Sequence, residues 1–180
     1  LGDVYKRQKE DITSFSANVN PLGVSPLLRS TLASHIDAIT SYPDREYTSL
    51  RECIAAYTGT DASQVIVGNG STELISLFIQ IEHPKKAMIL GPTYSEYERE
   101  ISLGGGTTLY YPLREKDDFV LDVDDFTAHL NESIDLLVLC NPNNPTGTVV
   151  EKEYLATLIS HNPQVCFVID QSYELSLIHI

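Results

Sequence analysis

The chain has 180 residues, which is enough for one globular domain with a sizeable core. Hydrophobic residues make up 42% of it and charged residues 21%, an ordinary balance for a globular protein. The 25 acidic residues outnumber the 12 basic ones and give a formal net charge of -13. Such a charge disfavours phosphate backbones and anionic lipids, so we expect neither a nucleic acid nor a membrane as partner.

Three cysteines, Cys53, Cys140 and Cys166, lie far apart and show neither a disulfide framework nor metal-ligand spacing. We therefore expect buried thiols in a reducing cytoplasm, and no bound metal. The longest apolar runs are too short to cross a bilayer. Residues 1–8 and 175–180 do not follow the pattern of the chain between them, so we interpret both ends as non-native tails.

Helices are expected from the first part of the chain onward. Ser25 followed by Pro26 predicts a helix start, because serine caps a helix and proline fits its first turn. Leu28, Leu32 and Ile36 then recur at helical spacing. Further helices are predicted over 48–57, 71–81, 93–103, 123–130 and 151–160. Thr48 is the expected cap of the helix over 48–57, and Asp122 that of the helix over 123–130. The helix from Ser71 has four apolar residues on one side, Leu74, Leu77, Phe78 and Ile81.

Short apolar runs between these helices predict strands over residues 65–67, 87–90, 107–111, 134–140 and 165–169. Strands that are apolar on both faces and alternate with helices indicate an α/β fold, a mostly parallel sheet with helices on both faces. Ligands of such sheets bind at the carboxyl ends of the strands. The candidate binding segments are therefore 68–72, 91–94, 141–147 and 170–173.

The segment Gly68-Asn69-Gly70-Ser71-Thr72 joins a predicted strand to a helix. Glycines let the backbone approach a ligand, and a helix N-terminus offers free N–H groups, so the segment suits a phosphate. A plain turn fits the same residues. The spacing is neither a Walker loop nor a dinucleotide fingerprint.

Three further features follow strands. In residues 141–147 two prolines restrict the turn, and asparagine side chains can bond both backbone and ligand. Asp170 ends a buried strand, where a carboxylate is costly unless paired. A helix cap, a salt bridge or a cationic ring nitrogen would each satisfy it. The Tyr94 ring could lie on a flat ligand or pack on the sheet.

These features carry a resemblance. Asn-Pro-Asn-Asn-Pro-Thr-Gly at 141–147, followed by a strand ending in Asp170 and by Tyr173, resembles fold-type I pyridoxal 5'-phosphate (PLP) enzymes of aminotransferase class I/II. Residues 18–23 and 42–44 are similar to the histidinol-phosphate aminotransferase branch. The chain most resembles the threonine-phosphate decarboxylases of cobalamin synthesis. The residues that carry this resemblance are 15–23, 68–70 with Glu73, and 113–115. The resemblance covers residues 11–174.

The resemblance implies a role for four residues at the cofactor ring. Tyr94 would stack on the pyridine ring, and Asn144 and Tyr173 would hydrogen-bond its phenolic oxygen. Asp170 would pair with the protonated ring nitrogen, which keeps the ring an electron sink.

Five further residues receive roles in the same way. The backbone amides of Gly70, Ser71 and Thr72 would hold the cofactor phosphate. Asn20 would lie near the substrate. Tyr42 would reach the cofactor phosphate of a neighbouring subunit, so the resemblance implies a homodimer.

The chain departs from the family pattern in three ways. Gln171 replaces the usual acidic residue after Asp170, a change from which we expect little effect. The His-Gly pair that helps the decarboxylases to hold the substrate phosphate is absent. The Schiff-base lysine and the substrate-binding arginines are also missing, since none of the six lysines follows the strand of Asp170: Lys6, Lys9, Lys85, Lys86, Lys116 and Lys152.

We therefore expect an N-terminal piece of a longer cytoplasmic enzyme, inactive and unstable by itself. Its parts would be an N-terminal arm and small-domain segment at 9–40 and a partial PLP-binding large domain at 41–174. The expected activity is that of a threonine-phosphate decarboxylase on a small phosphorylated amino acid. Histidinol-phosphate aminotransferase or another class I/II aminotransferase is the alternative. A non-enzymatic module that binds a phosphate ligand is the outside alternative, because a fold does not fix a function.

Overall fold

A computed structural model describes residues 18, 20, 22–130 and 133–174. The expected non-native tails, 1–8 and 175–180, lie outside the described residues. The chain forms two compact units, Leu1–Leu50 and Arg51–Ile180, and helix α2 (Thr48–Thr58) contains the boundary between them.

The described part of the first unit is helical. Helix α1 (Pro26–Ser34) begins where the sequence predicts it, and the Ser25 hydroxyl accepts a hydrogen bond from the Leu28 backbone N–H at 3.1 Å. The 3-10 helix η2 (Ile36–Thr40) follows. The apolar residues predicted along this helix, Leu28, Leu32 and Ile36, are all exposed.

The segment before α2 is held by a carboxylate. Asp44 accepts hydrogen bonds from the backbone N–H groups of Glu46 at 3.0 Å and Thr48 at 2.8 Å, and these bonds lower the pKa of its side chain. Thr48 was expected to cap the helix, but it is the first residue of α2. The Asp44 side chain instead satisfies the free N–H group of Thr48.

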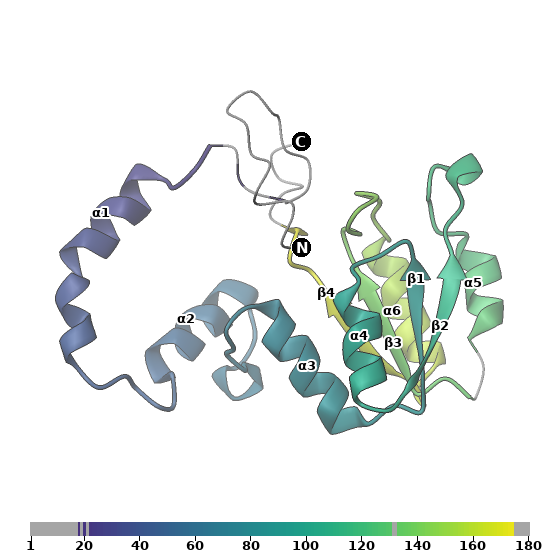
Figure 1. Cartoon of the computed structure of the whole chain (residues 1–180), viewed down its shortest axis with the longest axis horizontal. Coiled ribbons are helices and arrows are strands. Elements are labelled where there is room, and N and C mark those ends of the chain that lie inside the picture. Colours follow the sequence, from purple (N-terminus) through teal and green to yellow (C-terminus); the bar gives the residue numbers. More distant parts are fainter. Residues whose placement is uncertain (1–17, 19, 21, 131–132, 175–180) are drawn as a thin grey trace, which may run out of the picture. The chain divides into compact units, whose positions relative to one another are not determined.

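The second unit is built on four parallel strands in the order β2–β1–β3–β4 (Figure 1). Their bounds are β1 (Lys86–Gly91), β2 (Thr107–Pro112), β3 (Leu136–Cys140) and β4 (Cys166–Asp170). The helices of this unit are η3 (Ala62–Gln64), α3 (Ser71–Glu82), α4 (Glu96–Leu103), η4 (Glu115–Asp117), α5 (Val123–His129) and α6 (Lys152–His161). The parallel sheet confirms the expected α/β class.

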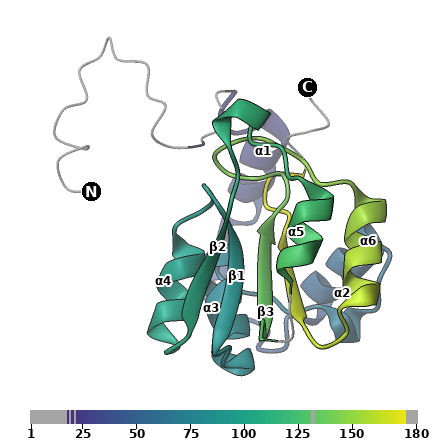
Figure 2. The same ribbon diagram turned by 90° about the vertical axis from the view of Figure 1, so that its right-hand side faces the viewer.

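Both faces of the sheet are apolar, as the sequence of β3 shows. All five of its residues are buried. Leu137 and Leu139 pack in a cluster with residues of α5 and α6, whereas Leu136, Val138 and Cys140 pack in a second cluster with residues of α3 and α4. Figure 2 shows α3 and α5 on opposite faces of the strands. The alternation of side chains along β3 thus fixes which helices cover which face.

One predicted strand does not form. Val65 has an extended backbone, but residues 65–67 join no sheet among the described residues. The Val65 N–H donates to the Ala62 carbonyl at 3.3 Å, and the Val65 carbonyl accepts from the Arg51 guanidinium at 3.0 Å. Because a turn and a side chain already satisfy these backbone groups, Val65 has no need of a neighbouring strand.

Two helices also differ from the prediction. In α3 the buried residues are Ile75 and Ile79, whereas Leu77, Phe78 and Ile81 of the predicted apolar side are exposed. Helix α4 begins at Glu96 rather than at residue 93, whose hydroxyl is bonded to the Asn143 side chain.

The thiols are only partly as expected. All three cysteines are free, but Cys53 is exposed, Cys166 is half-buried and only Cys140 is fully buried. The prediction of buried thiols is therefore wrong for Cys53.

Candidate functional site

The loops that follow β1, β3 and β4 meet at the carboxyl edge of the sheet. Cys140 and Asp170 are register partners at the ends of β3 and β4, and the Asn141 N–H donates to the Asp170 carbonyl at 2.8 Å. On the other side of β3, the loop after β1 is joined to the loop after β3: the Thr93 hydroxyl donates to the Asn143 side-chain carbonyl at 2.8 Å. Three of the four predicted binding segments, 91–94, 141–147 and 170–173, are thereby brought together.

Two asparagines of the 141–147 loop have structural roles that sequence reasoning did not separate from binding. The Asn141 side chain makes hydrogen bonds with both the N–H and the carbonyl of Val150, at 2.8 and 2.9 Å. The Asn143 amide donates to the Pro92 carbonyl at 3.0 Å and to the Thr146 hydroxyl at 2.8 Å. Both side chains are buried, whereas Asn144 is half-buried. Of the three, Asn144 is the one whose side chain suits a ligand.

Asp170 is held by three donors. Its Oδ2 accepts a hydrogen bond from the Tyr97 hydroxyl at 2.7 Å. Its Oδ1 accepts from the Ser172 N–H at 2.9 Å and from the Ser172 hydroxyl at 2.6 Å. No salt bridge to Asp170 is found in the described part of the chain, so hydrogen bonds rather than a cation satisfy this carboxylate.

Sequence reasoning missed Tyr97. The residue lies on α4 with its side chain fully buried, and it joins the apolar cluster of α3 and α4. Its ring meets the ring of Tyr94 edge to face, with centroids 5.6 Å apart. Burial, a hydrogen bond with the Cys140 thiol and the bond to Asp170 raise the pKa of Tyr97, so its hydroxyl remains a donor. The available signal was its place three residues after Tyr94 on a predicted helix.

Tyr94 is half-buried and packs against the same cluster. The interpretation that Tyr94 packs on the sheet is therefore confirmed. Its contact with a flat ligand stays a prediction.

The glycine turn gives α3 an open N-terminus. Gly70, the N-cap residue, has φ 81° and ψ 170°, and no side chain caps the helix. Ser71 and Thr72 are exposed. A Cβ built on Gly70 would meet nothing within 4 Å, so space lies in front of this backbone. Helix α3 leads into the amino end of β1, and its N-terminus therefore points toward the carboxyl edge of the sheet.

An acidic residue completes this turn. The Glu73 carboxylate accepts a hydrogen bond from the Asn69 N–H. Glu73 lies in the first turn of helix α3, and its bond to Asn69 closes the glycine turn that precedes the helix. The helix dipole also favours an acid at this position.

Three predicted site residues remain, Tyr173, Asn20 and Tyr42. Tyr173 follows β4 and is half-buried. Asn20 and Tyr42 belong to the first unit. The Asn20 carboxamide accepts from the Leu22 N–H at 2.9 Å, and Tyr42 is 87% exposed. The roles of these three residues stay predictions.

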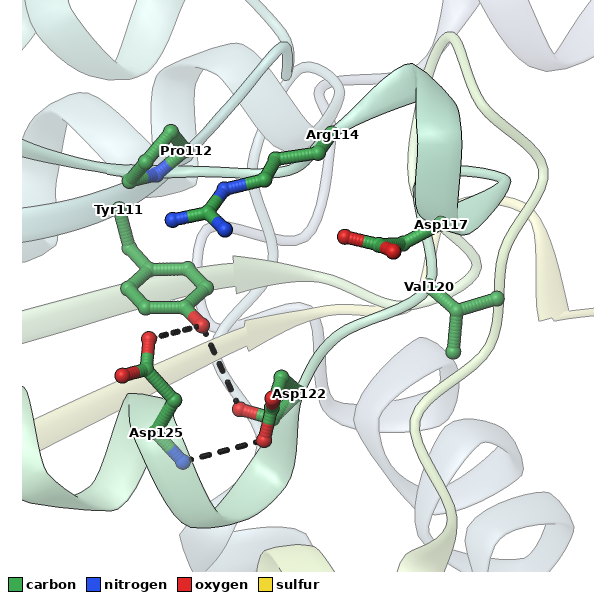
Figure 3. A pocket seen from close by; sticks show the side chains of 7 residues that line it. All are labelled: Tyr111, Pro112, Arg114, Asp117, Val120, Asp122 and Asp125. Atoms are coloured by element: carbon green, nitrogen blue, oxygen red, sulfur yellow. Dashed lines mark hydrogen bonds between the residues drawn. The ribbon is translucent and has the colours of Figure 1, made fainter.

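A separate concavity lies beyond the carboxyl end of β2 (Figure 3). Its lining residues are Tyr111, Pro112, Arg114, Asp117, Val120, Asp122 and Asp125. Its polar groups bond mainly to one another: the Tyr111 hydroxyl donates to the Asp125 carboxylate at 2.8 Å, and the Asp125 N–H donates to the Asp122 carboxylate at 3.1 Å. Three carboxylates face one guanidinium, which disfavours an anion. None of the predicted site residues lines it.

Among the described residues, no group of three or more His, Cys, Asp or Glu side chains could hold a metal ion. None of their helices combines the length and the hydrophobicity that a membrane crossing requires.

The parallel sheet, the acid at the end of β4 and the open helix N-terminus define an α/β protein with a candidate site at the carboxyl edge. The family description "Aminotransferase class I and II" matches residues 10–176. The chain therefore belongs to the class I and II aminotransferase family, a family of enzymes, and the resemblance seen in its sequence is confirmed.

Individual relatives fall in two groups within this family. The chain is 36% identical over 149 residues to the threonine-phosphate decarboxylase of Salmonella typhimurium, covering 83% of this chain and 41% of that protein. It is 32% identical over 168 residues to the histidinol-phosphate aminotransferase of Caldicellulosiruptor saccharolyticus, covering 92% and 46%. The crystal structure of L-threonine-O-3-phosphate decarboxylase from Porphyromonas gingivalis superposes with a TM-score of 0.77 at 27% identity, covering 90% and 47%. The chain thus spans less than half the length of each.

Proposed function

We propose that this chain supplies the cofactor-binding part of a PLP enzyme that acts on a small phosphorylated amino acid. The observation that carries the proposal is the Asp170 carboxylate, held by hydrogen bonds at the carboxyl end of β4 beside the 141–147 loop. Membership of the class I and II aminotransferases makes PLP the expected cofactor.

The residues present fit this cofactor. Its phosphate needs N–H donors and room for close approach, and the uncapped N-terminus of α3 behind Gly70 offers both. Its ring needs a flat surface and an acceptor for the ring nitrogen, and Tyr94 and Asp170 offer these. We therefore assign the phosphate to the amides of Gly70, Ser71 and Thr72.

PLP supplies an electron sink for charge that develops at the α-carbon of an amino acid. The contribution of the chain is to keep that sink effective. An ionised Asp170 accepts the ring N–H and favours the protonated nitrogen. Asn144 and Tyr173 would donate to the phenolic oxygen, and Tyr94 would hold the ring plane.

The proposal includes groups outside the chain. The Schiff-base lysine and the arginines for the substrate carboxylate would come from a longer polypeptide, consistent with relatives more than twice as long. In that enzyme, residues 9–40 would form the arm and small-domain segment, and residues 41–174 part of the large domain. Asn20 would lie near the substrate, and Tyr42 would reach the cofactor of a second subunit in a cytoplasmic homodimer.

The reaction that we propose is decarboxylation of threonine phosphate. The 36% identity to the Salmonella enzyme supports it. Transamination of histidinol phosphate is the second candidate, supported by 32% identity over more of the chain. Assay of the longer polypeptide with each substrate separates them: release of carbon dioxide from threonine phosphate supports the first, and 2-oxoglutarate-dependent turnover of histidinol phosphate the second.

Binding by the chain itself is tested by titration with PLP, followed by quenching of tyrosine fluorescence. We expect saturable binding, weaker binding of pyridoxal, which lacks the phosphate, and weaker binding of PLP to Asp170→Asn. Equal affinity for PLP, pyridoxal and a nucleotide would contradict the assignment. Tight binding of a nucleotide alone would favour the non-enzymatic phosphate-binding module.

A further inference from the structure

The Asp170 carboxylate is bound asymmetrically. Its Oδ1 faces Ser172, an exposed residue whose N–H and hydroxyl both donate to it. Its Oδ2 receives the Tyr97 hydroxyl at 2.7 Å, from the interior of the protein. Water can replace an exposed donor, but it cannot easily replace one that is fully buried. The hydrogen bond to Oδ2 is therefore harder to replace than the hydrogen bonds to Oδ1.

The Tyr97 ring has little freedom. Its side chain has no exposed surface, and it packs among Ile75, Ile89 and Ile101 in the cluster of α3 and α4. The Tyr94 ring lies edge-on against it. Moving the Tyr97 hydroxyl oxygen away from Oδ2 would require the ring to turn, and a packed core leaves no room for a second rotamer. The donor that faces Oδ2 is thus fixed by the fold.

We propose that Tyr97 is a positioning residue for the proposed cofactor function: its buried hydroxyl fixes the Asp170 carboxylate in the orientation that accepts the cofactor ring N–H. The inference rests on the proposed function and adds a residue to it. The Tyr97 hydroxyl acts only through Asp170, whereas the Tyr97 ring packs against the Tyr94 ring. Tyr94, which would cover the ring plane, contacts the same tyrosine that orients the acceptor of the ring nitrogen.

The alternative is that Tyr97 is an ordinary core tyrosine whose hydroxyl uses the nearest acceptor. The chain offers a matched control for that alternative. Tyr111 is also buried, and its hydroxyl donates to the Asp125 carboxylate at 2.8 Å, but this pair lies at the separate concavity of Figure 3. Tyr97→Phe and Tyr111→Phe each remove the hydroxyl of a buried tyrosine that donates to an aspartate. Only the first should affect the cofactor.

The experiment measures PLP affinity of the 180-residue chain for the wild type, Tyr97→Phe, Tyr111→Phe, Asp170→Asn and the Tyr97→Phe/Asp170→Asn double variant. We expect Tyr97→Phe to weaken binding about tenfold, the scale of one lost hydrogen bond to a charged group, and Tyr111→Phe to change it less than about twofold. In the Asp170→Asn background, Tyr97→Phe should have no further effect, because its route of action is already removed. Equal affinities of Tyr97→Phe and the wild type, or full additivity in the double variant, would overturn the inference.

A spectroscopic readout is independent of affinity. With PLP labelled by nitrogen-15 in the ring and each variant saturated, the ring-nitrogen resonance reports its protonation. Asp170→Asn sets the unprotonated limit, and we expect Tyr97→Phe to lie between that limit and the wild type. Tyr111→Phe should coincide with the wild type. A Tyr97→Phe resonance identical to that of the wild type would exclude a positioning role.

One measurement needs no variant, in case Tyr97→Phe fails to fold. In the wild-type chain with carbon-13 at the tyrosine Cζ atoms, PLP should shift the Tyr97 resonance, because the ring N–H then shares its acceptor, and leave Tyr111 in place. A Tyr97 signal unmoved by bound PLP would contradict the inference while leaving the proposed function intact. Absence of PLP binding by the wild type would defeat both.

Discussion

At the residue scale, the backbone of the glycine turn carries the phosphate proposal. Gly70 has a positive φ that L side chains rarely adopt, and the space in front of it is open. Nothing but hydrogen fits this conformation without strain. The same glycine also lets a ligand approach the first N–H groups of α3 closely.

Gly70→Ala should lower the free energy of unfolding by about 1–3 kcal/mol through backbone strain and weaken PLP binding as well. Gly105→Ala is the matched control, because Gly105 has φ 82° and open space around it but lies between α4 and β2, at the amino end of the sheet. It should cost a similar stability and leave PLP affinity unchanged. Urea denaturation and fluorescence titration of both variants measure the two effects. Equal losses of affinity would show that the glycine turn has no special relation to the phosphate.

At the element scale, the buried strand β3 supports the site through its position between β1 and β4. Its last residue is followed by the 141–147 loop, and its neighbour β4 ends at Asp170. The strand therefore sets the distance between the 141–147 loop and Asp170, which would both face the cofactor ring. A strand apolar on both faces gains stability from both covering layers.

Leu137→Ala should reduce the free energy of unfolding by about 2–5 kcal/mol, because the fully buried Leu137 would leave a cavity between the sheet and its helices. Leu77→Ala makes the same chemical change on α3, where Leu77 is 40% exposed, and should cost less than about 1 kcal/mol. Urea denaturation of both variants compares them. Similar losses at the two positions would mean that β3 is not the packed centre of this unit.

Hydrogen bonds of Asp135 also connect the amino ends of β3 and β1. The Asp135 carboxylate accepts from the N–H groups of Lys85 and Lys86 at 2.7 and 3.0 Å, which lowers the pKa of Asp135. It joins the amino ends of β1 and β3 in register. The ladder is thus held at both ends, by Asp135 at one and by the loop contacts of Asn143 at the other.

At the scale of the whole molecule, buried tyrosines and thiols make stability sensitive to alkaline pH. Burial and then the hydrogen bond to Asp125 raise the pKa of Tyr111 to about 12, and burial also raises the pKa of the Cys140 thiol. The folded state keeps these groups neutral, whereas the unfolded chain ionises a tyrosine near pH 10. The tyrosine contribution is complete below that pH and is lost as the pH rises through the folded value, whereas the loss of the thiol contribution begins at about pH 8.5, where an unfolded cysteine ionises.

We therefore expect the free energy of unfolding to fall steadily between about pH 10 and pH 12, and to fall less steeply in Tyr111→Phe, which cannot ionise at this position. Urea denaturation at several alkaline pH values measures the slope. A slope in Tyr111→Phe equal to that of the wild type would show that Tyr111 does not contribute to it. The comparison at neutral pH gives the cost of the lost hydrogen bond by itself.

The sequence by itself determined the strands β1 to β4, the α/β class and the family. Apolar runs such as 134–140 are readable because a central strand must be apolar on both faces, and that requirement is local. The 141–147 loop and Asp170 were readable as candidate binding segments because every parallel strand directs its carboxyl end to the same edge. Asp170 was correctly expected to need a partner.

Only the tertiary structure decided what those partners are. The sequence predicted a strand at 65–67, but the Arg51 side chain and a turn take the hydrogen bonds of Val65. It placed four apolar residues on one side of α3 but did not indicate that Ile75 and Ile79 are the buried ones, because a helix that is apolar on several sides can be buried along any of them. It gave no sign that Tyr97, 73 positions before Asp170, donates to that carboxylate. Periodicity reports what one element requires of its surroundings, whereas a contact between α4 and the end of β4 exists only once the sheet has brought the two together.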